Sequence, residues 1–118
     1  MATTTQVHIR SVRDEPADGD GFRVLVDRIW PRGVSKEAAA LDEWLKDVGP
    51  SNDLRQWFGH DPEKFEEFAK RYEQELADND EWRTLQQLVA EHGRVTLLFG
   101  AKDREHNQAV VLRDLLTR

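Results

Sequence analysis

The pattern of apolar and polar side chains divides the chain into short strands and amphipathic helices. Residues 7–12 alternate imperfectly between the two classes, and residues 22–30 form a denser apolar run that stops at Pro31 and Gly33. Residues 95–99 are apolar except for Thr96. Alternation is typical of a half-buried strand, and a short continuous apolar run is typical of a strand buried on both faces. The pattern therefore predicts three strands.

Between the second and third predicted strands, the apolar residues follow helical spacing. Ser35 has the side chain of a helix N-cap. The apolar residues that follow it at helical spacing are Ala38, Leu41, Leu45 and Val48. We expect one helix across residues 35–48, ended by Gly49 and Pro50. Ser51 is placed to cap a second, short helix, whose apolar residues are Leu54, Trp57 and Phe58.

The clearest helical stripe comes next. Asp61 is placed to cap it, and Pro62 suits the first helical position because its missing N–H loses no partner there. The apolar positions of this helix are Phe65, Phe68, Ala69, Tyr72 and Leu76. Asn79 begins a further helix, which Gly93 ends. A last helix follows a loop at residues 100–105, and its apolar residues are Ala109, Val111, Leu112, Leu115 and Leu116.

This order of elements predicts the fold class. A continuous apolar strand followed by a loop and a helix is typical of α/β proteins with parallel sheets. We expect a small two-layer or three-layer α/β sandwich, with a mostly parallel sheet of three to four strands and about five helices. The length of 118 residues corresponds to one domain. We expect this domain to span residues 1–118, with residues 1–5 flexible.

Composition excludes several classes of protein. The chain has no cysteine, which removes disulfides, thiol catalysis, Cys-based zinc sites and iron–sulfur clusters. No apolar run approaches the ~20 residues of a membrane helix, and the N-terminus lacks the pattern of a signal peptide. We therefore expect a cytoplasmic protein that does not bind a membrane. Four Trp, five Phe and one Tyr supply core residues and argue against intrinsic disorder.

The acidic residues are concentrated in one block. The formal net charge of −6 disfavours binding to a nucleic-acid backbone. Residues 61–83 carry nine acids and four bases, whereas residues 23–36 and residues 94–118 have net charges of +3 and +2. Twelve of the 17 bases are Arg, the side chain best suited to bidentate recognition of carboxylate or phosphate. Codon bias of the source genome is the alternative explanation for this preference.

Part of each basic segment follows a predicted strand. In parallel α/β sheets, ligands bind beyond the carboxyl ends of the strands. Segment 27–33 leaves the second strand, and segment 100–107 joins the last strand to the last helix. If these strands are neighbours, Arg28, Arg32 and Lys102 converge on one anion. The N-terminus of the last helix adds to the attraction.

Other side chains of the same region complete a candidate site. Trp30 and Trp57 would wall the pocket, and Asn107 would orient a ligand. The candidates for proton transfer are Asp27, Asp103 and His106. Each residue also has a simpler structural interpretation: sheet-edge pairing for Asp27 and Arg28, core packing for Trp30, capping of the last helix for Asp103, an ordinary surface histidine for His106, solvent exposure for Lys102, and pairing with a nearby carbonyl for Asn107.

Motifs for other chemistries are missing from the sequence. The histidines show no metal-ligand spacing, so we expect no metal site; they are His8, His60, His92 and His106. Neither glycine-rich phosphate loop occurs, and we expect no cofactor. The serine hydrolase motif GxSxG is also missing. The acidic block 61–83 predicts a solvated face of two helices, or alternatively a docking face for a protein partner.

Several segments together match the pattern of a known family. The longest are VDRIWPRGV at 26–34, VTLLFGAKD at 95–103 and EHNQAVVL at 105–112, and shorter matches occur at 44–45, 50–51, 54–58, 68, 71–72 and 75–76. These segments resemble the YeaO-like family, a branch of domain of unknown function 488. The resemblance covers nearly the whole chain and implies a small cytoplasmic α/β protein without an established reaction.

More distant relatives in that group have Asp-Val-Arg after the second strand and Cys-His-Arg near the last helix. Asp27-Arg28 is similar to the first motif. The region of His106 departs from the second, because the chain has no cysteine. Thiol chemistry therefore does not carry over to this chain.

Two functions from different classes follow from these features. The first is binding of an anionic small molecule of phosphate, nucleotide or carboxylate type, with hydrolytic or transfer activity as an extension. The second is a non-enzymatic interaction or regulatory domain that uses the acidic face 61–83 to bind a protein partner. The sequence leaves the oligomeric state open.

Overall fold

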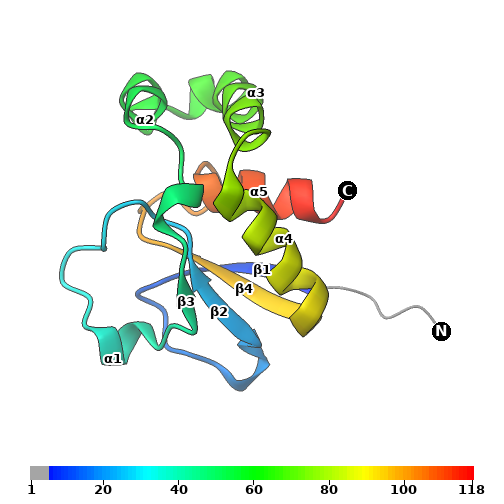
Figure 1. Cartoon of the computed structure of the whole chain (residues 1–118). Coiled ribbons are helices and arrows are strands. Elements are labelled where there is room, and N and C mark those ends of the chain that lie inside the picture. Colours follow the sequence, from blue (N-terminus) through cyan, green and yellow to red (C-terminus); the bar gives the residue numbers. More distant parts are fainter. Residues whose placement is uncertain (1–5) are drawn as a thin grey trace.

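The computed structural model describes residues 6–118 as a four-stranded sheet with helices packed against it (Figure 1). The strands are β1 (Gln6–Ser11), β2 (Phe22–Leu25), β3 (Glu43–Trp44) and β4 (Arg94–Phe99). All neighbouring strands are parallel, in the order β1-β4-β2-β3. The predicted α/β class with its parallel sheet is confirmed. The expectation of flexibility at residues 1–5 lies outside the described residues.

Within the described residues, five α-helices accompany the sheet. They are α1 (Lys36–Ala39), α2 (Asn52–Phe58), α3 (Phe65–Leu76), α4 (Asp80–His92) and α5 (Gln108–Leu116). Single 3-10 turns lie at Asp18–Asp20, Lys46–Val48 and Pro62–Lys64. Within residues 6–118, no helix combines the length and the apolar character needed to cross a membrane.

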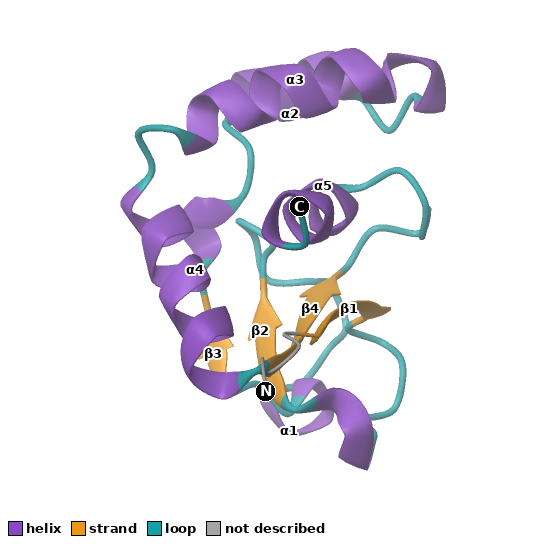
Figure 2. Cartoon of the chain, turned by 90° about the vertical axis from the view of Figure 1, so that its right-hand side faces the viewer, coloured by secondary structure: helices purple, strands orange, loops and turns teal. Residues whose placement is uncertain are grey.

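The two faces of the sheet are covered unequally (Figure 2). Helices α4 and α5 lie over one face, α2 and α3 lie farther out beyond α5, and the short α1 lies on the opposite side of the sheet. Successive side chains of β4 point to opposite faces of the sheet. Val95, Leu97 and Phe99 belong to the main core beneath the long helices. Leu98 packs instead with Leu25 in a smaller core on the other face.

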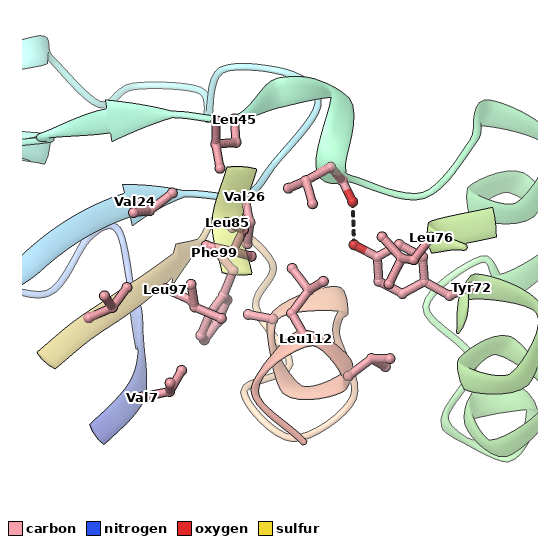
Figure 3. Packing of buried hydrophobic residues seen from close by; sticks show 14 of the residues in the cluster. Val7, Val24, Val26, Leu45, Tyr72, Leu76, Leu85, Leu97, Phe99 and Leu112 are labelled. Carbon is pink, nitrogen blue, oxygen red and sulfur yellow. Dashed lines mark hydrogen bonds between the residues drawn. The ribbon is translucent and has the colours of Figure 1, made fainter. Parts of the chain in front are cut away.

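Buried side chains extend the main core from the sheet to the outer helices. Leu112 of α5 lies between the sheet and Tyr72 of α3 (Figure 3). The Tyr72 hydroxyl donates a 2.5 Å hydrogen bond to the backbone oxygen of Val48. Burial raises the pKa of Tyr72 well above its ordinary value, which keeps the hydroxyl a neutral donor. The bond satisfies a polar group that would be costly to bury alone.

Side-chain caps confirm most of the predicted helix boundaries. The hydroxyl oxygens of Ser35 and Ser51 and the amide oxygen of Asn79 each accept a backbone N–H in the first turn of the helix that follows. Gly93 ends α4 with a φ of 72°, which glycine adopts without strain. Asp61 caps the 3-10 turn that leads into α3, rather than α3 itself.

The predicted helix across residues 35–48 is wrong. Helix α1 ends at Ala39, Ala40 takes a left-handed conformation with a φ of 49°, and the chain then forms β3 beside β2. Arg23 explains the early end, because its guanidinium donates hydrogen bonds to the backbone oxygens of Ala39 (2.8 Å) and Ala40 (3.1 Å). An ion pair with Asp20 holds the guanidinium in place. Tertiary contacts here outweigh the helical spacing of the apolar residues.

The second predicted strand is also shorter than its apolar run. β2 ends at Leu25 rather than at residue 30, although the N–H of Val26 still donates to the backbone oxygen of Leu98 (3.1 Å). Beyond this point the chain leaves the sheet, because the polar side chains of Asp27 and Arg28 bond to other segments. This departure creates the site described next.

Candidate functional site

A cavity of about 330 Å³ lies at the carboxyl ends of β2 and β4. These two strands pair directly, with Leu25 opposite Leu98. Segments 27–33 and 100–107 therefore leave the sheet side by side, and residues of both line the cavity. The spatial neighbourhood on which the predicted site depends is present in the structure.

Asp27 is fixed in the cavity wall by two hydrogen bonds. Its Oδ2 accepts the N–H of Gly100 (2.8 Å), and its Oδ1 accepts an amide N–H of Gln108. These bonds tie the end of β2 to the end of β4 and to the start of α5. Burial raises the pKa of Asp27 to about 6, outweighing the hydrogen bonds and the nearby Arg13 and Arg55, which lower it.

Gly100 makes this close approach possible. A Cβ atom at this position would lie 2.8 Å from Oδ2 of Asp27 and 3.1 Å from two side-chain atoms of Pro31. Any side chain would therefore push Asp27 and Pro31 away from the end of β4. The glycine is required here by space.

Arg28 is anchored to backbone oxygens on the other side of the cavity wall. Its Nε donates to the oxygen of Pro50 (3.1 Å) and its Nη2 to the oxygen of Gly49 (2.9 Å). Its Nη1 lies 3.5 Å from a carboxylate oxygen of Asp47. The guanidinium thus has a structural role at the sheet edge, as the simpler interpretation predicted, and it also lines the cavity.

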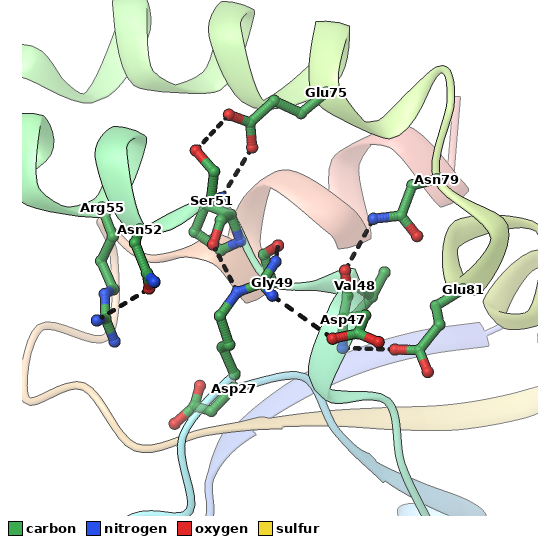
Figure 4. A network of polar contacts seen from close by, with 12 residues as sticks. Asp27, Asp47, Val48, Gly49, Ser51, Asn52, Arg55, Glu75, Asn79 and Glu81 are labelled. Carbon is green, nitrogen blue, oxygen red and sulfur yellow. Dashed lines mark hydrogen bonds and ion pairs between the residues drawn. The ribbon is translucent and has the colours of Figure 1, made fainter.

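The backbone oxygens that accept hydrogen bonds from Arg28 belong to segment 47–51. This segment is held in place by side chains of α3, of α4 and of the N-cap of α4 (Figure 4). Glu75 accepts the backbone N–H (2.9 Å) and the hydroxyl (2.6 Å) of Ser51. Glu81 accepts the N–H of Asp47 (2.5 Å), and Asn79 donates to the oxygen of the same residue (2.8 Å). Part of the acidic block therefore supports the cavity wall from outside.

Three further arginines, Arg13, Arg32 and Arg55, line the cavity from separate parts of the chain. Arg13 follows β1 and donates to the backbone oxygens of Gly100 (2.7 Å) and Arg32 (3.0 Å). Arg55 belongs to α2, where its Nη2 contacts the amide oxygen of Asn52 (3.3 Å). Within residues 6–118, no carboxylate oxygen lies within 4.0 Å of a guanidinium nitrogen of Arg13, Arg32 or Arg55.

Asp103 orders the loop that precedes α5. Its Oδ1 accepts the N–H groups of Glu105 (2.9 Å) and His106 (3.0 Å), and its Oδ2 lies 3.0 Å from Nδ1 of His106. The hydrogen bond from Glu105, followed by those from His106, lowers the pKa of Asp103. The His106 ring lines the cavity and packs edge-on against Phe65, whereas Asp103 is not among the lining residues.

The N-cap of α5 is Asn107, not Asp103, which corrects one of the alternatives for Asp103. The Asn107 side-chain oxygen accepts the N–H of Val110 (3.2 Å), and its Nδ2 donates to the backbone oxygen of Asp103 (2.9 Å). The residue is only 2% exposed. Its amide is therefore occupied within the chain, as the simpler interpretation predicted.

The remaining predicted residues divide between the cavity and the surface. Trp30 lines the cavity, and its Nε1 donates to the backbone oxygen of Val34 (2.7 Å). Trp57 lies outside the lining, with the guanidinium of Arg71 over its ring at 4.2 Å. Lys102 is exposed and also lies outside the lining. The structure therefore gathers six of the nine predicted residues: Asp27, Arg28, Trp30, Arg32, His106 and Asn107.

Comparison with known proteins identifies the family. Residues 6–118 match the family described as the inactive DUF488-N3 subclade. The chain belongs to this family. The predicted resemblance to the YeaO-like branch of domain of unknown function 488 is confirmed by this match and by the relatives below.

Relatives of similar length cover almost the whole chain. An uncharacterized protein of Mycobacterium tuberculosis (strain ATCC 25618 / H37Rv) is 40% identical over 116 residues, which cover 98% of each chain. Uncharacterized protein YeaO of Escherichia coli (strain K12) is 38% identical over 110 residues, covering 93% of this chain and 96% of its own. No solved structure matches the chain.

Several cavity residues of this family member escaped the sequence analysis. Arg13 had a usable signal, because it follows a predicted parallel strand whose carboxyl end reaches the same edge of the sheet. Arg55 and His60 had none, because the position of α2 over this edge is set by tertiary packing. Gln108 was missed because only the apolar residues of the last helix were considered. Among the described residues, no group of three His, Asp or Glu side chains is arranged to hold a metal ion.

Proposed function

We propose that this family member binds a small anionic molecule, of phosphate, nucleotide or carboxylate type, in the cavity at the carboxyl ends of β2 and β4. The observation that supports this is the distribution of arginine ion pairs. Of the twelve arginines, eight lie within 4.0 Å of a carboxylate among residues 6–118. Three of the other four, namely Arg13, Arg32 and Arg55, line this one cavity.

The electrostatics of the cavity favour an anion. Four arginines and one carboxylate, Asp27, line it, so the fixed charge of the walls is positive although the whole chain is acidic. A guanidinium presents five N–H donors, and its bonds to carboxylate or phosphate are among the stronger hydrogen bonds in proteins. A concave site lined by one sign of charge also concentrates ligands of the opposite sign.

Size and wall chemistry fit a small organic molecule. The volume of about 330 Å³ falls in the range of ligand cavities, roughly 300–1,000 Å³. Apolar side chains of Trp30, Phe58 and Phe68 line the cavity beside the arginines. The walls therefore offer an apolar surface for a carbon skeleton next to donors for its anionic group.

Binding without turnover is the form of this function that we favour. No hydroxyl, thiol or primary amine is among the side chains that line the cavity within residues 6–118. The carboxylate of Asp27 is already held by two hydrogen bonds. The description of the family as an inactive subclade supports the same conclusion. Hydrolytic or transfer activity, with proton transfer by Asp27, Asp103 or His106, stays a prediction.

The alternative, a protein partner at the acidic face 61–83, stays a prediction with less support. Acids of this block already make contacts within the chain. Glu67 pairs with Arg71 of the same helix, and Glu75 and Glu81 hold the cavity wall. These contacts account for part of the negative charge without a partner.

A thermal-shift screen with matched arginine variants tests the proposed function. The purified protein is melted with phosphate, nucleotides, sugar phosphates and carboxylate metabolites. A ligand at a hundred times its dissociation constant stabilises the folded state by about 2.7 kcal/mol, which raises the melting temperature. The test variant is Arg32→Ala with Arg55→Ala, because neither side chain has a carboxylate partner within residues 6–118. The control is Arg94→Ala, because Arg94 also has no carboxylate partner in the described part of the chain but lies outside the cavity lining.

We expect an anion to raise the melting temperature of the wild type and of Arg94→Ala, and to lose its effect on the double variant. Equal shifts in all three proteins would place the binding elsewhere. The absence of any shift across the screen would refute the proposed function and give more weight to a protein partner.

A further inference from the structure

One wall of the cavity carries hydrogen-bond acceptors that are not filled by the chain. Asp27 and Gln108 lie side by side there, joined by the bond from the Gln108 amide nitrogen to Oδ1 of Asp27. Each carboxylate oxygen of Asp27 accepts one hydrogen bond from the chain, the second coming from Gly100. A carboxylate oxygen has two acceptor sites, so each oxygen retains one for a further donor.

The amide of Gln108 adds a third acceptor. An ionised carboxylate accepts but does not donate, so the Gln108 nitrogen must face Asp27. Its Oε1 then points away from that bond, and no donor within residues 6–118 lies within hydrogen-bond distance of it. Gln108 is part-buried in the cavity wall, and since no fully buried side-chain oxygen of residues 6–118 lacks a partner, this Oε1 is open to solvent in the cavity, where a ligand can reach it.

The two arginines whose charges act on Asp27 do not supply the missing donors. Arg13 and Arg55 act on the Asp27 carboxylate through their charge, but Arg13 donates its hydrogen bonds to backbone oxygens and Arg55 donates to the side chain of Asn52. In Figure 4, Asp27 and Arg55 approach the same region from the end of β2 and from α2. The cavity thus presents cationic donors on some elements and unfilled acceptors at the junction of β2 and α5.

We infer that the ligand of this cavity carries neutral hydrogen-bond donors, hydroxyl or amide N–H groups, beside its anionic group, and that these donors bond to Asp27 and Gln108. The inference rests on the proposed function and adds the chemical class of the ligand. A positively charged donor fits less well, because four arginines line the same small cavity. A simple anion without donors would leave the acceptors of Asp27 and Gln108 desolvated and unpaired.

Matched pairs of ligands test the inference. Glycerol 3-phosphate and propyl phosphate share a three-carbon chain and a phosphate, and only the first has hydroxyl groups. Glycerate and propionate form the corresponding pair of carboxylates. Isothermal titration calorimetry at neutral pH measures the dissociation constant of each. Because a hydrogen bond to a charged acceptor is involved, we expect the hydroxylated member of the bound pair to bind about tenfold more tightly.

A variant of the acceptor assigns the preference to its residue. In Asp27→Asn, we expect the preference for the hydroxylated ligand to fall below about threefold, while propyl phosphate binds at least as tightly as to the wild type, because a negative charge has been removed. A purely structural role of Asp27 would weaken both ligands alike. Asp114→Asn, which removes an exposed carboxylate of α5 outside the cavity, is the control and should keep the preference.

The outcomes separate the inference from the proposed function. Equal affinity within both pairs would overturn the inference and leave anion binding intact. A preference that persists unchanged in Asp27→Asn would overturn the assignment to Asp27. Failure of all four ligands to bind would refute the anion site and, with it, the inference.

Discussion

Replacing Asp27 by asparagine isolates the electrostatic effect of burying its carboxylate. Asparagine has nearly the same shape, and its side-chain oxygen can still accept the N–H of Gly100. The amide of Gln108 can turn so that its oxygen accepts from the new NH₂ group. The substitution therefore removes the charge and keeps the link between the ends of β2 and β4.

The size of the effect follows from the pKa of Asp27, which burial raises from 3.8 to about 6. Each pKa unit corresponds to about 1.4 kcal/mol, so ionisation of the carboxyl group lowers the free energy of unfolding by about 3 kcal/mol. For an acid with a raised pKa, this part of the stability is complete below pH 3.8 and is lost as the pH rises through about 6. The variant escapes this loss.

Urea denaturation followed by tryptophan fluorescence, repeated between about pH 3 and pH 8, measures the effect. We expect the free energy of unfolding of Asp27→Asn, minus that of the wild type, to grow by about 3 kcal/mol across this range. Taking the difference cancels the titration of groups that both proteins share. A difference that stays constant with pH, or that shrinks as the pH rises, would refute the reasoning.

Two further substitutions test the loops around the cavity. Gly100→Ala should lower the free energy of unfolding by about 1–3 kcal/mol in urea denaturation, because the new Cβ would lie 2.8 Å from Oδ2 of Asp27; unchanged stability would show that the junction is loosely packed. Asp103→Asn should destabilise the protein at neutral pH, since hydrogen bonds lower the pKa of Asp103. Its effect should vanish as the pH falls through the folded-state pKa, the opposite sign to Asp27, and an effect equal at neutral and acid pH would contradict this.

The helices were predictable where local sequence alone decides them. The apolar stripe of α3 and the capping residues Asn79 and Gly93 of α4 each act within a single helix. The local sequence is therefore enough to predict them. The wrong prediction of a helix across residues 35–48 has a different cause. There the deciding groups are the guanidinium of Arg23 and the edge of β2, which are distant in sequence. No local pattern reports such contacts.

The part of the candidate site that lies at the ends of the strands was predictable from the sequence. Segments 27–33 and 100–107 meet because β2 and β4 are neighbours. The sequence analysis assumed this adjacency, and the structure contains it. Arg55 reaches the cavity through the placement of α2, which depends on packing among distant helices. Lys102 shows the converse, because a residue at a strand end can still point to solvent.

The strand order has a consequence for how the chain acquires its structure during synthesis. β4 lies between β1 and β2, so the two strands made first do not pair with each other. Their only route into a common sheet is insertion of a strand made much later, ending at Phe99. Such long-range pairing slows folding, and a nascent chain stopped before residue 94 would expose strand edges prone to aggregation. The ribosome must therefore synthesise β4 before the cavity at the β2–β4 junction can form at all.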